Sequence, residues 1–447
     1  MTQLKYVIKR NGVKVPFTSQ RISNAIYRAA VAVGGRDRQM AEDLTANVID
    51  YLESTLPADH VPTVEEVQDA VEKELIEKGH AKVAKAYILY RDERARMRNQ
   101  REFQTIHPSE NIPWAKIWQV LDWAASHDLH TIEKYNQRLA KGELQQITSE
   151  SEIFYEEDIK VAAERISKRR GEVKIVLISG PSSSGKTTTT IKIGQILSQQ
   201  GISLVALNVD NYFHDLDQHP KDEFGDYDFE TPQALDLELI NEHLEDLVKG
   251  EEVMTPIYDF KSGRRLEKRT PMRIGPNDII LIDSLHGLYP PMTANIAPER
   301  KFKLYLEPLL QMKDQQGNYI RWTDIRLLRR MLRDQAFRSY DPEKTLTHWH
   351  YVRNSEMRNI IPNHVHADFI INSAMPYELS IYKTKLESYF DKWVNTYKDD
   401  PLREDAFKRA ARIRQVLEEI SPLADDTFVP SDSVIREFIG GSSLQYH

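Results

Sequence analysis

Eight residues in the middle of the chain, GPSSSGKT at 180–187, have the types and spacing needed to hold a phosphate group. They fit the pattern G-x-x-x-x-G-K-[ST] and follow the apolar run 175–178, as a phosphate-binding loop (P-loop) requires. Glycines let the backbone turn tightly, so that N–H groups and the N-terminus of the next helix point at one anion. A strand-to-helix turn without a ligand is the alternative. The residues expected to surround the phosphates are Gly180, Ser182, Ser183, Ser184, Gly185, Lys186, Thr187 and Thr188.

Two residues of this loop have distinct chemical tasks in the P-loop mechanism. Lys186 would reach the β- and γ-phosphates of a nucleoside triphosphate, and Thr187 would offer its hydroxyl to Mg²⁺. ATP and Mg²⁺ are therefore the expected cofactors.

Two aspartates follow later apolar runs, at the strand ends where open α/β sheets bind ligands. Asp210, in NVDNYFHD, suits a general base that accepts the proton of an acceptor hydroxyl, with a helix N-cap or turn role as the alternative. Asp283 ends the run IILID and is predicted to contact Mg²⁺ directly or through water. His286 follows closely, and packing or turn structure is its simpler interpretation.

A run of arginines lies between residues 326 and 338 at helical or near-helical spacing. One interpretation is a solvated helix face paired with Asp324 and Asp334. The other is a lid whose guanidinium groups stabilise the transferred phosphoryl and exclude water, which is a role for two or three of them. The arginines are Arg326, Arg329, Arg330, Arg333 and Arg338.

The elements that must position these residues divide the chain into four predicted regions. Residues 1–97 combine a hairpin around Asn11–Gly12 with helices, one of which begins at a capping box at Thr63. Residues 98–168 are expected to form a helical connector. Strands alternate with helices over 169–376, which predicts an α/β fold with a parallel sheet. A helical extension is expected over 377–447.

Composition narrows the classes of function. A length of 447 residues indicates two or three domains, and a net charge of −8 with mixed signs argues against a general nucleic-acid surface. The absence of cysteine excludes disulfides, thiol nucleophiles and Cys-ligated metals. No window approaches the roughly 20 apolar residues of a membrane span, and the N-terminus lacks an apolar signal core. A cytoplasmic enzyme without membrane or nucleic-acid partners is the expectation.

Six segments between about 173 and 375 together resemble the uridine kinase and phosphoribulokinase group of P-loop kinases. They are GPSSSGKT, VDNYFHD, GDYDFETPQALD, TPIYDFKSGRR, IILIDSLHGL and RRMLRD. The resemblance implies a P-loop kinase sheet flanked by helices, with Asp210 as base and Asp283 as the acid at the metal. It places the lid arginines at Arg329, Arg330, Arg333 and Arg338. The implied acceptor-binding residues are Tyr258 and Asp228, and Tyr212 and Arg264 are further candidates for substrate binding.

The acceptor side departs from that family. Uridine kinases usually have a histidine near the nucleobase of the acceptor, and Gly263 stands at that place here. The strand that leads to the metal ends in Asp283-Ser284 instead of Glu-Gly. The insertion EPLLQMKDQQGNYIRWTD before the lid is also longer than in plain uridine kinases. A uridine- or cytidine-type nucleoside is the first expectation for the acceptor. A sugar phosphate or a glycerate-type acid is an alternative, and so is a nucleotide-sensing regulator that transfers nothing to a small molecule.

Residues 5 to about 95 resemble the ATP-cone, a regulatory nucleotide-binding domain of ribonucleotide reductases and their repressors. The resemblance rests on KYVIKRNGVKVPF, RISNAIYRAA and AKAYILYRDERAR. It implies a mainly helical domain with a β-hairpin, in which Lys9 and Arg10 meet the phosphates of an adenine nucleotide effector. Taken alone, two basic residues beside an Asn-Gly turn more often form an ordinary hairpin. Assembly into a homo-oligomer is left open.

Overall fold

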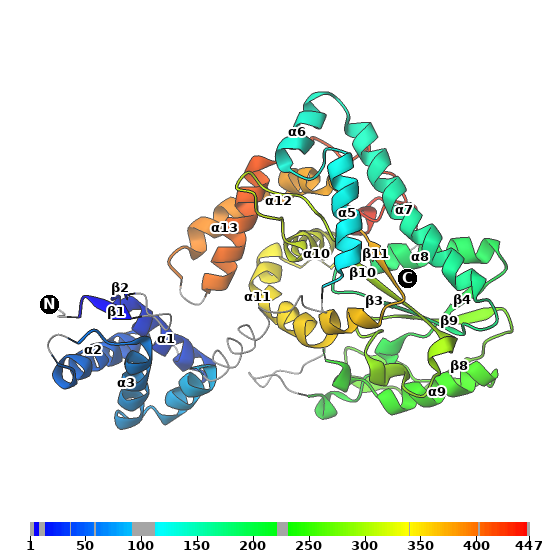
Figure 1. Ribbon diagram of the computed structural model, residues 1–447. Helices are drawn as coiled ribbons and strands as arrows, with labels where there is room; N and C mark the ends of the chain where they lie inside the picture. The colour runs from blue at the N-terminus through cyan, green and yellow to red at the C-terminus, as the bar shows by residue number, and fades with distance from the viewer. Residues whose placement is uncertain are drawn as a thin grey trace. The chain divides into compact units, whose positions relative to one another are not determined.

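The computed structural model describes residues 4–8, 14–35, 37–57, 60–91, 112–220, 231–338, 340–400 and 403–444. The chain divides into two compact units, one of residues 1–109 with 400–402 and one of residues 110–399 with 403–447. Figure 1 shows both units and labels most of their helices and strands.

The N-terminal unit pairs a short hairpin with a helical core. Strands β1 (Tyr6–Ile8) and β2 (Lys14–Pro16) are antiparallel, and the predicted turn residues between them, Lys9 and Arg10 included, lie outside the described residues. The helices are α1 (Ser19–Ala32), α2 (Arg38–Thr55), α3 (Val64–Glu77) and a helical stretch over 81–91. Their apolar faces form one buried cluster.

The predicted capping box of α3 is confirmed. Thr63 Oγ1 accepts from the backbone N–H of Glu66 at 3.2 Å, and Glu66 accepts from the backbone N–H of Thr63 at 2.7 Å. Two N–H groups that the helix cannot satisfy are thereby paired, which fixes where α3 begins.

The larger unit contains the predicted parallel sheet, which has five strands in the order β11-β10-β3-β9-β4. The central strand β3 precedes the phosphate-binding loop. Because all five strands run the same way, their carboxyl ends meet at one edge, where β3, β9 and β4 are neighbours. The strands are β3 (Ile175–Ser179), β4 (Ser203–Ala206), β9 (Asp278–Asp283), β10 (Lys301–Glu307) and β11 (Phe369–Asn372).

Both faces of this sheet are buried, which explains the continuous apolar runs of its strands. In β3, Val176 and Ile178 enter one core cluster, while Ile175 and Leu177 enter the other. Helices α7 (Leu144–Lys168) and α8 (Lys186–Gln199) cover the first face, and α9 (Leu237–Lys249) covers the second (Figure 1).

Helices from the predicted connector and the C-terminal extension belong to the same core as the sheet. The connector supplies α5 (Trp114–Ser126), α6 (Ile132–Ala140) and α7, and Tyr135 and Tyr155 are fully buried in the cluster that contains β3. Apolar residues at helical spacing on both segments face that cluster, because the α/β sheet offers a large apolar face there. These segments therefore complete the kinase-like unit.

The remaining elements surround the carboxyl edge of the sheet. Two small antiparallel pairings, β5 with β8 and β6 with β7, lie beyond α9, and four long helices follow β10 and β11. The elements are β5 (Val253–Thr255), β6 (Tyr258–Asp259), β7 (Arg264–Arg265), β8 (Thr270–Met272), α10 (Trp322–Arg338), α11 (Pro342–Ser355), α12 (Glu378–Tyr397), α13 (Glu404–Glu419) and α14 (Arg436–Ile439). Among the described residues, no helix is both long enough and apolar enough to cross a membrane.

Candidate functional site

The loop between β3 and α8 has the geometry of an anion-binding site. Ser183 and Gly185 adopt left-handed conformations, with φ of 60° and 92°, and Gly185 is the N-cap of α8. Successive N–H groups in such a turn converge on the concave side, and the helix dipole adds a partial positive charge there. The buried hydroxyl of Ser183 has no hydrogen-bond partner among the described residues, which leaves it available to a ligand.

Two glycines of the loop are required by close neighbours. A Cβ on Gly180 would lie 2.3 Å from the carbonyl oxygen of Leu306, and one on Gly185 would lie 2.5 Å from a methyl group of Val434. The φ of Gly185 would also strain any side chain there. Both glycines of the motif are thus fixed by the packing of the loop against β10 and the C-terminal segment.

Lys186 and Asp283 form the charged centre of the site. Lys186 Nζ donates to the carbonyl oxygen of Gly180 at 3.0 Å, and burial lowers its pKa while the negative charge of Asp283 partly opposes that change. Asp283 ends β9 and is paired in register with Ile178 of β3. Burial raises the pKa of Asp283 to about 6, although the charge of Lys186 lowers it. A buried carboxylate of this kind is stabilised when a cation is bound beside it.

Asp283→Asn is expected to stabilise the ligand-free protein at pH 8 by about 2 kcal/mol and by much less at pH 4.5. The raised pKa means that the folded state holds this proton more tightly than the unfolded state does. The stability of the wild type should therefore fall as pH rises from about 4 to 6, whereas asparagine has no charge to bury. Urea unfolding of both proteins at the two pH values measures the difference. An equal effect at both would contradict the assignment.

Asp210 lies at the same edge of the sheet, in the 3₁₀ turn Val209–Tyr212 that follows β4. The N-cap role is taken by Asn208, whose side chain accepts from the N–H of Asp210 at 3.0 Å. Asp210 lies at the surface, and its carboxylate has no hydrogen-bond partner in the described parts of the chain. Desolvation raises its pKa, and the charge of Lys186 lowers it. A carboxylate without a structural partner, close to a lysine in a P-loop, is well placed to accept a proton.

On the acceptor side, an aromatic cluster surrounds Tyr258. Its ring centroid lies 5.6 Å from that of Phe213 and 5.0 Å from that of Phe260, and its buried hydroxyl has no hydrogen-bond partner among the described residues. Tyr212 is fully buried, and its hydroxyl bonds to His243 Nδ1 at 2.8 Å, so it packs below the cluster. Predicted Asp228 lies outside the described residues.

The β6–β7 turn explains the glycine that departs from the family pattern. Gly263 has φ of 65°, and a Cβ there would lie 3.0 Å from the side chain of Leu216. Arg264 is exposed. The neighbouring Arg265, which the sequence did not single out, pairs with Asp236 at 2.9 Å and donates to the carbonyl oxygen of Tyr212 at 2.7 Å. It thus ties this hairpin to the turn that carries Asp210.

The arginines of α10 separate into two groups. Arg330 Nη1 lies 3.3 Å from Ser182 Oγ of the loop, and the positive charge of Arg333 contributes to lowering the pKa of Lys186. Both also contact Asp334, which holds them at the face toward the loop. Arg338 is exposed at the end of the helix.

Arg329 differs from the expected lid role because it is fully buried. Its guanidinium forms a two-bond pair with Glu378 of α12, at 2.7 and 3.0 Å, and donates to the carbonyl oxygen of Ser373. Arg326 is likewise buried and pairs with Glu356. These two residues fix α10 in the core, and Arg326 also donates to the backbone carbonyl oxygen of the loop residue Ser182 at 3.2 Å. Arg330 and Arg333 are the arginines on this side of α10 that are not fully buried.

Two glutamates that sequence reasoning missed contact the loop directly. Glu356 accepts from the backbone N–H of Ser182 at 3.2 Å. Glu437 accepts from both the backbone N–H and the hydroxyl of Thr188, at 3.1 and 2.9 Å. Both are far from the loop in sequence, so no local pattern could have indicated them.

Comparison with known families decides the interpretation of this geometry. Residues 5–96 match the ATP cone domain, and residues 175–379 match the Phosphoribulokinase / Uridine kinase family. The chain joins an ATP-cone to a kinase domain of the phosphoribulokinase and uridine kinase family. The expected kinase fold is confirmed, and the protein is an enzyme that transfers a phosphoryl group to a hydroxyl group.

Curated relatives of the kinase domain are uridine kinases. Uridine-cytidine kinase B of Dictyostelium discoideum is 29% identical over 198 residues, which cover 44% of this chain and 73% of that protein. The uridine kinase of Deinococcus deserti is 27% identical over 198 residues, covering 44% of this chain and 86% of its own length. The uridine kinase of Mycoplasma genitalium is 33% identical over 133 residues, covering 30% and 60% of the two chains.

Proposed function

We propose that this kinase uses ATP and Mg²⁺ to phosphorylate a hydroxyl of a pyrimidine nucleoside of the uridine or cytidine type. The observation that carries the proposal is the arrangement at the carboxyl edge of the sheet. The P-loop after β3, Asp283 at the end of the adjacent β9 and Asp210 after the next strand β4 all face this edge. The nucleoside as acceptor is supported by the uridine kinase relatives and by the aromatic cluster around Tyr258.

In this mechanism the acceptor oxygen attacks the γ-phosphorus in line, and the bond from that phosphorus to the ADP oxygen breaks. Asp210 accepts the hydroxyl proton as the new oxygen–phosphorus bond forms. Lys186 and the loop N–H groups hold the phosphates, while Arg330 and Arg333 stabilise charge on the transferred group. The residues fit these tasks because Asp210 has no competing structural partner and both arginines face the loop.

Mg²⁺ fits the oxygen donors present, the Thr187 hydroxyl and the Asp283 carboxylate. The described residues contain no group of three or more metal-binding side chains, and Mg²⁺ beside a nucleotide typically takes one or two carboxylates with phosphates and water. When bound, it would neutralise charge on the β- and γ-phosphates.

An acceptor panel tests the proposal. Release of ADP from ATP and Mg²⁺ is measured with uridine, cytidine, adenosine, guanosine, a sugar phosphate and glycerate as acceptors. We expect the highest kcat/KM with a pyrimidine nucleoside. Preference for the sugar phosphate or for glycerate would show that the acceptor belongs to that class and is not a nucleoside. ADP release that no acceptor increases would indicate a nucleotide-sensing regulator.

We further propose that an adenine nucleotide at the ATP-cone adjusts this activity. Coupling requires the nucleotide to bind two states of the protein with different affinity. Replacing Lys9 and Arg10 together with alanine is the test, with dATP as the added effector. If dATP changes the rate equally in the wild type and the double variant, the cone has no part in control.

Glu437→Gln is expected to tighten ATP binding about fivefold, which corresponds to ~1 kcal/mol. The Glu437 carboxylate already lies at the N-terminus of α8, where the helix dipole and N–H groups favour a phosphate. Glutamine keeps a hydrogen-bond acceptor for Thr188 but removes the negative charge that repels ATP. Equilibrium binding of ATP without an acceptor measures the effect.

The matched control is Asp432→Asn in the same C-terminal segment. Asp432 pairs with Lys192 at 2.9 Å, so its loss loosens the segment without removing the carboxylate at Thr188. ATP affinity should change little in this control. Equal tightening in both variants would attribute the effect to the mobility of the segment instead of the charge of Glu437.

A further inference from the structure

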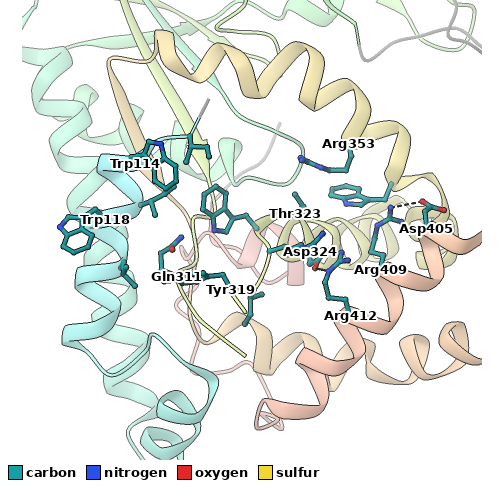
Figure 2. A pocket seen from close by; sticks show the side chains of 17 residues that line it. Trp114, Trp118, Gln311, Tyr319, Thr323, Asp324, Arg353, Asp405, Arg409 and Arg412 are labelled. Atoms are coloured by element: carbon teal, nitrogen blue, oxygen red, sulfur yellow. Dashed lines mark hydrogen bonds and ion pairs between the residues drawn. The ribbon is translucent and has the colours of Figure 1, made fainter. Parts of the chain in front are cut away.

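A cavity of about 940 Å³ lies in the larger unit, and none of its lining residues belongs to the P-loop (Figure 2). It is formed by α5, the segment 319–324, α11 and α13. Its lining residues on α5 and α13 lie outside both family matches, which cover 5–96 and 175–379. Neither the kinase reaction nor the ATP-cone accounts for this cavity.

One side of the cavity presents aromatic rings. Trp114 and Trp118 of α5 are 53% and 68% exposed, and Tyr319 is 45% exposed. Trp322 is held in place by a 3.0 Å hydrogen bond from its Nε1 to the carbonyl oxygen of Leu310. Clustered exposed aromatic side chains commonly mark a binding site, because leaving them in water is unfavourable. Flat rings of this kind suit a planar partner that can stack on them.

The opposite side carries the charged groups. Figure 2 shows Arg353, Arg409 and Arg412 across the cavity from Trp114 and Trp118. The lining contains four arginines, these three and Arg321, and two aspartates. The aspartates are Asp324 and Asp405. Glu356 pairs with Arg353 from outside the lining, so the charge of Arg321 is the one left without a paired carboxylate among the described residues.

The arginines are held in defined positions. Arg412 makes two 2.7 Å hydrogen bonds to Asp324, and Arg409 pairs with Asp405 at 3.1 Å. Arg321 is exposed, and its guanidinium forms no hydrogen bond or ion pair with the described residues. Planar guanidinium groups bind phosphate oxygens in pairs and lose little freedom in doing so when they are already fixed.

We propose that this cavity binds a nucleotide, with its base stacked on the aromatic side and its phosphates at the arginines. The volume falls in the range of small-molecule sites, roughly 300–1,000 Å³. An apolar ligand would leave the positive charge of Arg321 unpaired, and a simple anion would leave the aromatic rings exposed to water. Stacking on aromatic side chains together with arginine contacts is how proteins commonly hold bases and phosphates at once. This proposal does not depend on the acceptor of the kinase.

The test variant combines Trp114→Ala with Arg321→Gln. Both residues are exposed, and neither is placed in the kinase machinery. Arg353 is unsuitable, because it pairs at 2.6 Å with Glu356, which in turn accepts from the loop residue Ser182. The matched control is Arg414→Gln, an arginine of α13 that pairs with Asp391 and does not line the cavity.

Photolabelling of the full-length protein distinguishes this cavity from the other nucleotide sites. The probes are 8-azido-ATP and 5-azido-UTP, and the labelled peptides are mapped by mass spectrometry. We expect one of the probes to label peptides containing residues 112–121 or 319–322, with at least fivefold less label in the double variant and unchanged label in the control. Unlabelled nucleotide should compete, whereas the free nucleoside and inorganic phosphate should not.

Three results would overturn the proposal. Label confined to the P-loop and the residues of the ATP-cone would show that the cavity binds no nucleotide. Undiminished cavity label in the double variant would exclude the predicted contacts. Competition by phosphate alone would reduce the site to a simple anion site. Because labelling needs no turnover, none of these results depends on whether the proposed kinase reaction is correct.

Discussion

Replacing Asp210 by asparagine is expected to lower kcat about a thousandfold while leaving the Kd of ATP close to that of the wild type. The carboxylate follows β4, which is two strands from the P-loop strand β3 in the sheet order. No side chain among the described residues forms a hydrogen bond or an ion pair with it. Asparagine keeps the size of the side chain but cannot accept the hydroxyl proton. Loss of a general base acts on the chemical step, so nucleotide binding should be spared.

The exposed Asp217→Asn, in the next turn of the same segment, is the matched control and should keep wild-type kcat. Rates are followed as ADP release with the best acceptor, and ATP binding by equilibrium titration. A kcat within threefold of the wild type for Asp210→Asn would remove Asp210 from the mechanism. A large rise in the Kd of ATP would indicate a structural role instead.

Replacing Arg329 by methionine is expected to destabilise the larger unit by about 3–5 kcal/mol, because the substitution leaves Glu378 buried without its partner. Both side chains are 0% exposed, and three hydrogen bonds connect Arg329 to Glu378 and to the carbonyl oxygen of Ser373. An uncompensated buried carboxylate is costly, since neither water nor another cation can reach it. Urea unfolding followed by tryptophan fluorescence measures the loss.

The second substitution Glu378→Leu tests the cause. In the double variant no charge is left unpaired, so most of the lost stability should return. Arg338→Met, at the exposed end of the same helix, should change stability by less than about 0.5 kcal/mol. If the double variant is as unstable as Arg329→Met alone, the loss comes from packing and not from the buried charge.

The parts of the site that the sequence predicts are those with local signals. The glycines, the lysine and the threonine of the P-loop lie within eight residues, and Asp283 directly follows an apolar run. Parallel strands have their carboxyl ends at one edge of the sheet, so the sequence also predicts that these residues lie at the same edge. The order of the motifs along the chain also predicts the two family regions, the ATP-cone and the kinase domain.

The side of α10 that faces the loop could not be predicted. Arg329 and Arg330 are neighbours with the same side chain, yet one is buried against Glu378 and the other contacts Ser182. Helical spacing alone cannot separate them, because α10 is covered on more than one face. The deciding partner, Glu378, belongs to a helix that comes 49 positions later in the chain.

The contact between Glu437 and Thr188 also has a consequence for biosynthesis. These residues are 249 positions apart, and Val434 packs against Gly185 from the same late segment. Chains emerge from the ribosome from the N-terminus onward, and contacts between distant positions form late. The first turn of α8 therefore lacks the contact with Glu437 until the segment around residue 437 has been made. Synthesis of this segment, more than completion of the family-matched region at residue 379, should mark the point at which the nucleotide site acquires its final form.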